Sequence, residues 1–146
     1  MASTLQVVKS KMDDPIPMGY CNSGIIIDSL IDDYKKGDRV ISNGNHAEIV
    51  RIPKNLIAKI PDNVDDDMAS FAVIGSIALQ GVRLMNPTIG ETVVVQGLGL
   101  VGLMAVQILL ANGCKVIGID FSEFRCNLAK KYGAHAINLS DKQNPI

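Results

Sequence analysis

The sequence has few cysteines and almost no net charge. Its three cysteines, Cys21, Cys114 and Cys126, are odd in number and form no CxxC pair. They therefore argue against a disulfide framework or a zinc knuckle, and predict reduced thiols in a cytoplasmic protein. The formal net charge is −1, from 14 Lys and Arg against 15 Asp and Glu, with no basic run. A nucleic-acid partner is therefore not expected.

The sequence also lacks a long hydrophobic run. The longest, Leu100–Ala111, is interrupted by Gly102 and Gln107, whereas a membrane-spanning helix needs about 20 apolar residues. The first residues, MASTLQVVKSKMDD, have no apolar core of signal-peptide length. We expect neither a membrane partner nor an export signal. Because 47% of the residues are hydrophobic, intrinsic disorder is excluded as well.

The composition changes near residue 70, which predicts two domains, 1–70 and 71–146. Before the change, short runs rich in β-branched residues are separated by turn residues. These predicted strands are 24–31, 38–42, 46–52 and 56–60. Consecutive short strands with tight turns indicate an antiparallel meander or a small, partly open barrel.

An acidic triplet, residues 65–67, marks the start of the helical part. We expect Asp62 or Asn63 to cap a helix whose first turn carries the triplet, where negative charge is favourable. Adjacent carboxylates on a helix point about 100° apart, so they cannot converge on one metal ion. A second helix over 76–85 should end before Pro87, because proline disfavours the α conformation of the preceding residue.

The remainder alternates between apolar runs and helical stretches. Strands are predicted over 92–95, 115–120 and 134–139, with helices over 100–112 and from Ser122 to Gly133. Continuous apolar strands that alternate with helices of this length indicate a parallel sheet covered on both faces. The fold class is therefore α/β.

One motif carries chemistry. Residues 97–102, GLGLVG, have the pattern GxGxxG, directly follow a predicted strand and open a helix. Gly97 would allow a tight turn, Gly99 would let the backbone approach a pyrophosphate, and Gly102 would let helix and strand pack closely. Asp120 ends the next strand, 18 residues after Gly102. In this context the pattern predicts dinucleotide binding, and the alternative is a purely structural glycine turn.

The same region predicts which cofactor binds. Asp120 would accept hydrogen bonds from the ribose hydroxyls of an adenosine and would repel a 2′-phosphate, which favours NAD over NADP. Arg125 argues slightly against this choice, because a flexible arginine could partly neutralise a phosphate. The expected cofactor-binding residues are Gly97, Gly99, Leu100, Val101, Gly102, Asp120, Phe121 and Arg125. No catalytic residue is assigned.

From about Pro15 to Leu139 the sequence resembles the medium-chain dehydrogenase/reductase family. The resemblance is carried in order by PMGYCNSGIII, KKGDRVIS, HAEIVRIPKNLIAKIPDNV, MASF, GETVVVQGLGLVGLMAVQILLANGCKVIGID and AKKYGAHAINL. It implies a partial GroES-like β-barrel followed by the first half of a Rossmann doubly wound parallel sheet. It also implies an oxidoreductase that transfers hydride to or from an alcohol or carbonyl of a small-molecule substrate.

Two segments, TLQVVKSKMDDPIPMGY and SIALQGVR, are most similar to the dehydrogenase half of bacterial bi-domain oxidoreductases. That similarity implies a sugar derivative as substrate and a fused or associated second oxidoreductase domain. Full-length family members begin with further barrel strands and continue past a third Rossmann strand. The chain is therefore expected to be a fragment that is inactive alone. If it does not associate with a second oxidoreductase domain, its unfinished sheet predicts that it forms a homo-oligomer.

The sequence departs from the family's zinc enzymes, which carry a GHE motif where this chain has residues 19–21, GYC. Tyr20 replaces the histidine ligand, the neighbourhood of Val73 offers no cysteine, and 40–46 leaves no room for a structural zinc loop. A zinc-free branch with no metal site is implied. We interpret Tyr20 as a packing residue, although it or His46 could move a proton.

Three functions remain open. The first is a zinc-independent, NAD-dependent oxidoreductase of the medium-chain dehydrogenase type. The second is a non-catalytic dinucleotide-binding module. The third is an NADPH-dependent quinone or enone reductase, which fits the lack of zinc ligands but conflicts with Asp120.

Overall fold

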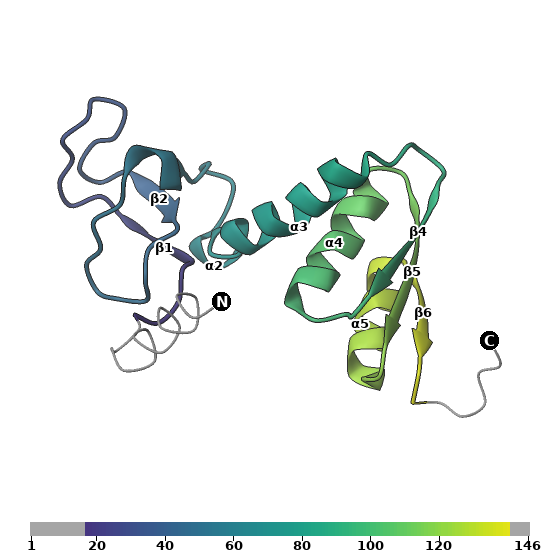
Figure 1. The fold of residues 1–146 in the computed structure, drawn as a ribbon. Coiled ribbons are helices and arrows are strands. Elements are labelled where there is room, and N and C mark those ends of the chain that lie inside the picture. Colours follow the sequence, from purple (N-terminus) through teal and green to yellow (C-terminus); the bar gives the residue numbers. More distant parts are fainter. Residues whose placement is uncertain (1–16, 141–146) are drawn as a thin grey trace, which may run out of the picture. The chain divides into compact units, whose positions relative to one another are not determined.

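The computed structural model describes residues 17–140. Most of the N-terminal segment that carries the bi-domain resemblance, and the last six residues, lie outside the described residues. The chain divides into two compact units between Val73 and Ile74, and each unit holds one three-stranded sheet (Figure 1).

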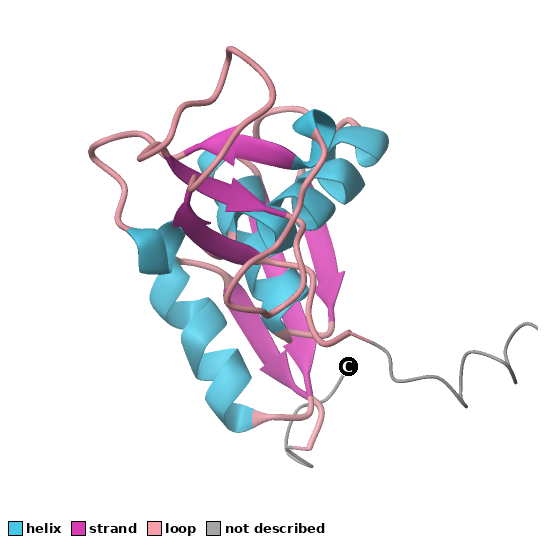
Figure 2. Cartoon of the chain, turned by 90° about the vertical axis from the view of Figure 1, so that its left-hand side faces the viewer, coloured by secondary structure: helices cyan, strands magenta, loops and turns pink. Residues whose placement is uncertain are grey.

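The sheet of the first unit is antiparallel. Its strands are β1 (Asn22–Ile25), β2 (Arg39–Ser42) and β3 (Ile57–Lys59), in the order β1-β2-β3. Ile41 lies opposite Ser23 on one side and Ala58 on the other, which sets the register. The predicted antiparallel meander is confirmed, although the strands are short and the loops between them are long (pink in Figure 2).

Two predicted strand regions are wrong. Residues 46–52 form no strand, because no described strand offers them a ladder of hydrogen bonds, and Ile49 is 70% exposed. The predicted strand over 24–31 ends at Ile25. Beyond it, the backbone N–H of Ser29 donates to Asp28 Oδ1 at 2.9 Å. Such local side-chain bonds compete with a sheet ladder for backbone groups.

The first unit also contains a short 3₁₀-helix, η1 (Lys54–Leu56), and α2 (Asp66–Ala69). The N-cap of α2 is Asp65, whose carboxylate accepts a hydrogen bond from the backbone N–H of Met68 at 2.7 Å. The predicted caps, Asp62 and Asn63, are therefore wrong by two or three residues. The capping interpretation of the acidic triplet is confirmed, because Asp66 and Asp67 occupy the first turn.

Helix α3 (Ala72–Met85) begins two residues before the second unit and leads to its parallel sheet. The helix begins four residues earlier than predicted and ends at Met85, before Pro87, as predicted. Asn86 follows with φ 51°, a left-handed conformation that asparagine tolerates better than most residues. None of the helices in the described part of the chain has the length and apolar character needed to cross a membrane.

The parallel sheet has the order β4-β5-β6. Its elements are β4 (Thr92–Gln96), α4 (Leu100–Ala111), β5 (Lys115–Asp120), α5 (Glu123–Tyr132) and β6 (His135–Asn138). All five were predicted within a few residues. Both predicted ends of α5 are confirmed: the Ser122 hydroxyl accepts a hydrogen bond from the backbone N–H of Arg125, and Gly133 ends the helix with φ 106°.

Helices α4 and α5 lie on the same face of this sheet (Figure 1). The core between them and the sheet contains the fully buried Leu98, Val106, Leu109 and Cys126. The prediction of helices on both faces is wrong for the described residues. Crossovers between parallel strands are right-handed, so two successive crossovers that step in one direction place both helices on one side. On β4 the alternate residue Val94 is 56% exposed.

Candidate functional site

The glycine-rich turn joins β4 to α4. Gly97 has φ 89°, a conformation that favours glycine, and its N–H donates to the Ile119 carbonyl at 2.8 Å. Gly102 lies against this turn, since a Cβ there would be 2.0 Å from the Gly97 carbonyl oxygen. The turn is therefore held against the end of β5, and the first turn of α4 packs directly on it.

The N-terminus of α4 is open. Gly99 is its N-cap and supplies no side chain to the first-turn N–H groups, and a Cβ at Gly99 would meet nothing within 4 Å. Leu100 and Val101, the first two helical residues, are 50% and 42% exposed. Backbone N–H groups without intrahelical partners, together with the helix dipole, form a site that suits an anion such as a pyrophosphate.

Asp120 lies beside this turn at the end of β5 and is only 9% exposed. Its Oδ1 accepts a hydrogen bond from the Ser122 N–H at 2.8 Å, and its Oδ2 accepts one from the Leu98 N–H at 2.7 Å. These two hydrogen bonds are the main reason why the pKa of Asp120 lies below its ordinary value. The nearby Arg125 charge also lowers this pKa, and together they outweigh the effect of desolvation. The carboxylate is therefore ionised at neutral pH.

The other predicted site residues surround this carboxylate. Arg125 Nη1 lies 3.7 Å from Asp120 Oδ2, and the arginine side chain is 52% exposed. Phe121 is 70% exposed. The structure thus brings the glycine-rich turn, Asp120, Phe121 and Arg125 to one end of the parallel sheet.

Sequence reasoning missed two contributors to the site, Leu98 and Ser122. The Leu98 side chain is completely buried, and it packs so closely on Gly118 that a Cβ there would lie 2.8 Å from its Cδ2. The backbone N–H groups of Leu98 and Ser122 both donate hydrogen bonds to the Asp120 carboxylate. Nearly every residue has a backbone N–H, so the sequence does not single out these two donors. The one signal was the position of Leu98 between two motif glycines.

A cavity of about 710 Å³ runs along β4 from this turn. It is bounded by parts of α3, β4 and α4, and none of its lining residues is charged. The lining includes Ile77, Met85, Val94, Gly97, Leu100 and Val101.

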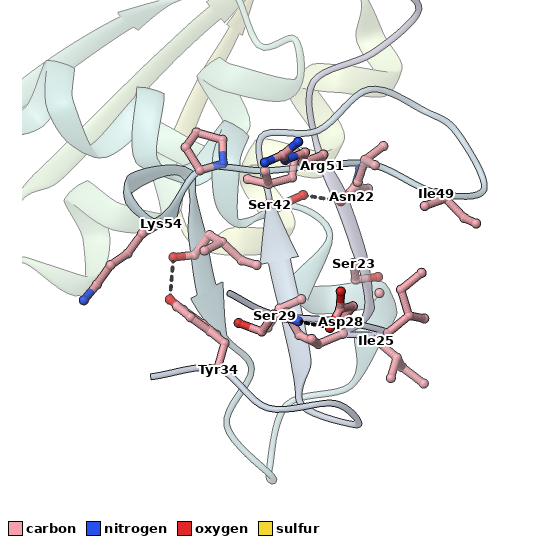
Figure 3. Close-up of a pocket in the computed structure, with 18 of the residues that line it drawn as sticks. Asn22, Ser23, Ile25, Asp28, Ser29, Tyr34, Ser42, Ile49, Arg51 and Lys54 are labelled. Atoms are coloured by element: carbon pink, nitrogen blue, oxygen red, sulfur yellow. Dashed lines mark hydrogen bonds between the residues drawn. The ribbon is translucent and has the colours of Figure 1, made fainter. Parts of the chain in front are cut away.

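A larger cavity, about 950 Å³, lies in the first unit (Figure 3). Several of its polar groups are bonded within the unit: the Ser42 hydroxyl donates to Asn22 Oδ1 at 2.6 Å, and the Tyr34 hydroxyl donates to the Ile57 carbonyl at 3.0 Å. Its lining contains no histidine or cysteine. We take the glycine-rich turn as the functional site, because it combines an open helix N-terminus with a buried, ionised carboxylate.

Within residues 17–140 no cluster of three His, Cys, Asp or Glu side chains could hold a metal ion. The Cys21 thiol donates a hydrogen bond to the Ser70 carbonyl. The His46 ring lies against Gly19, where a Cβ would be 2.2 Å from its Cδ2. These residues do not fit a zinc site. Tyr20 is 53% exposed, so its interpretation as a packing residue is wrong.

A parallel β-α-β-α-β unit, with a glycine-rich turn after its first strand and an acidic residue at the end of its second, belongs to the Rossmann class of dinucleotide-binding folds. Residues 101–145 also match the family model described as zinc-binding dehydrogenase. An alcohol dehydrogenase of Aspergillus clavatus is 30% identical over 129 residues, which are 88% of this chain and 32% of that protein.

Solved structures agree with this assignment. The alcohol dehydrogenase TADH from Thermus sp. ATN1 matches with a TM-score of 0.79 and 27% identity, over 88% of this chain and 48% of that one. A mycobacterial protein in complex with NADPH matches with a TM-score of 0.73 and 29% identity, over 82% and 41% of the two chains. The chain belongs to the medium-chain dehydrogenase/reductase family, and it spans about a third of the length of the curated relatives that it matches.

The fold that the family resemblance implied is confirmed. The antiparallel strands of the first unit form part of a GroES-like barrel, and the second unit is the first half of a Rossmann sheet.

Proposed function

We propose that this chain is the dinucleotide-binding part of an NAD-dependent, zinc-independent oxidoreductase that acts on an alcohol or carbonyl group of a small molecule. The observation that carries the proposal is the ionised Asp120 carboxylate beside the open N-terminus of α4. A bound nicotinamide dinucleotide would supply the hydride chemistry. The alcohol dehydrogenase relatives support the substrate class.

The residues of the turn have separate roles in this proposal. Gly99 leaves room for a pyrophosphate, and the N–H groups at the start of α4, at Leu100 and Val101, provide the positive end of the helix dipole. Asp120 recognises the ribose hydroxyls. The exposed Phe121 ring, next along the chain, is free to contact the adenosine.

The choice of NAD over NADP rests on charge. A 2′-phosphate near the ionised Asp120 would meet a like charge on a carboxylate that is itself only 9% exposed. Arg125 supports the second candidate, an NADPH-dependent reductase, because its guanidinium lies 3.7 Å from the carboxylate and is half exposed. The mycobacterial relative in complex with NADPH supports the same alternative.

Zinc independence rests on the ligands. A catalytic zinc needs about three protein ligands, and the described residues bring no such set together. A cytoplasmic location is proposed from the three unpaired thiols. The division into two domains, 1–70 and 71–146, is a proposal that rests on the sequence. So are a sugar derivative as substrate and a second oxidoreductase domain as partner.

Calorimetric titration of the chain with NADH and NADPH tests the proposed function. We expect NADH to bind about tenfold more tightly than NADPH, because only the 2′-phosphate opposes Asp120. Gly99→Val is the matched variant: it fills the open space above the turn and should weaken both cofactors equally. Equal or tighter NADPH binding would contradict the choice of NAD, and stoichiometric zinc in untagged protein would contradict zinc independence.

A further inference from the structure

We propose that Asp120 is also a positioning residue, whose carboxylate holds the glycine-rich turn and the start of α5 in the arrangement that binds a dinucleotide. The binding part of this inference rests on the proposed function. The positioning part concerns hydrogen bonds within the chain and can be tested without any ligand.

The two carboxylate oxygens bind two different backbone segments. Oδ2 accepts from the N–H of Leu98 in the turn at 2.7 Å, and Oδ1 accepts from the N–H of Ser122 before α5 at 2.8 Å. Leu98 and Asp120 are 22 residues apart in sequence. A single side chain therefore connects the phosphate-facing turn to the helix that carries Arg125.

The Leu98 N–H has no easy alternative to this bond. Its side chain is completely buried and packs against Gly118, so the residue cannot turn toward water without leaving the core. A buried N–H that loses its acceptor is unfavourable. Removing the carboxylate must therefore leave this N–H unpaired or displace the turn.

The Ser122 bond extends the connection into α5. The Ser122 hydroxyl accepts a hydrogen bond from the backbone N–H of Arg125 at 3.4 Å and so caps the helix. Among the described residues, two titratable or charged side chains contact Asp120. They are the Arg125 guanidinium, 3.7 Å from Oδ2, and the Cys126 thiol, whose Sγ donates to the Asp120 carbonyl oxygen at 3.7 Å.

Positioning and ribose recognition predict opposite effects on a nucleotide that lacks ribose hydroxyls. If Asp120 only recognised the hydroxyls, its removal would not weaken such a nucleotide. Loss of a negative charge near the diphosphate would even strengthen its binding. If Asp120 holds the turn, its removal weakens that nucleotide as well. In that case, replacing Asp120 in order to admit NADPH would weaken the binding of both NADH and NADPH.

The binding test uses the full chain, its Asp120→Ala and Asp120→Asn variants, and 2′,3′-dideoxyadenosine 5′-diphosphate in a calorimetric titration beside ADP. We expect Asp120→Ala to weaken the dideoxy nucleotide about tenfold, the scale of one lost hydrogen bond to a charged group. Asp120→Asn keeps one acceptor oxygen and should lose less. Glu123→Gln is the control, because it removes an exposed carboxylate at the start of α5.

The ligand-free test is amide hydrogen exchange at Leu98, compared as protection factors at pH 7. We expect Asp120→Ala to lower the protection of this amide about tenfold and Glu123→Gln to leave it unchanged. In the wild type, protection should fall only in acid, where the carboxylate takes up a proton.

The two readouts separate the two proposals. Unchanged Leu98 protection in both Asp120 variants, or unchanged or tighter binding of the dideoxy nucleotide by Asp120→Ala, would overturn the positioning role. If the wild type binds neither nucleotide, the proposed function fails and the exchange result alone decides the positioning role. If Asp120→Ala does not fold, Asp120→Asn supplies both measurements.

Discussion

Gly102 shows how much the site depends on one missing methyl group. A Cβ at this position would lie 2.0 Å from the Gly97 carbonyl oxygen, far inside van der Waals contact, and the obstacle is backbone that cannot rotate away. By contrast, a Cβ at Gly81, on α3 in the same unit, would meet nothing within 4 Å. Two glycine-to-alanine changes on helices of one unit should therefore have opposite effects.

We expect Gly102→Ala to lower the free energy of unfolding by about 2 kcal/mol or more, because the first turn of α4 must move away from β4. Gly81→Ala should raise it by up to about 1 kcal/mol, because alanine has the higher helix propensity. Urea denaturation of the three proteins measures both changes. Equal stability of Gly102→Ala and wild type would show that the turn adapts.

The residues of the site were only partly predictable. Glycines and a carboxylate at fixed spacing are visible in a sequence because their chemistry lies in the side chain. Two donors to the Asp120 carboxylate are the N–H groups of Leu98 and Ser122, which nothing in the sequence distinguishes from other backbone donors. The buried position of Leu98 comes from its packing on Gly118, a contact between residues far apart in the chain.

At the scale of the element, the cap of α2 offers a test with a built-in control. Asp65→Ala removes the acceptor of the Met68 N–H and should lower the free energy of unfolding by about 1 kcal/mol. Asp62→Ala removes the same charge from an exposed residue three positions earlier that is not the cap, and should change stability by less than about 0.5 kcal/mol. Thermal or urea unfolding measures both. Equal losses would mean that charge, rather than capping, stabilises this helix.

Elements with local signals were predicted, and those that need a distant partner were not. Ser122, Gly133 and Pro87 mark helix ends through their own backbone chemistry, and the structure confirms all three positions. Residues 46–52 have the composition of a strand but lack a neighbour in the described sheet. Composition does not show whether a partner strand is present, because strand formation depends on a neighbour that can be far away in the sequence.

At the scale of the whole molecule, the apolar surfaces of the second unit are incompletely covered. The sequence of α4 is apolar almost all round, yet Leu100 and Val101 are half exposed, and Val94 on β4 is 56% exposed. In the described sheet β4 is an edge strand, and its five residues include neither proline nor a charged side chain. Natural edge strands normally carry such protection against association.

We therefore expect the 146-residue chain to self-associate through this surface at tens of micromolar. The lining of the adjacent cavity has no charged residue, so two copies can meet there across a two-fold axis without repulsion. Val94→Lys would place like charges opposite each other and should shift association to concentrations about tenfold higher or more. Two control variants add the same charge elsewhere: Phe124→Lys on α5, where the residue is 73% exposed, and Ile49→Lys in the first unit, where it is 70% exposed. Both should leave the association unchanged. Sedimentation equilibrium measures all four proteins: a wild type that stays monomeric, or association that Val94→Lys leaves intact, would contradict the prediction.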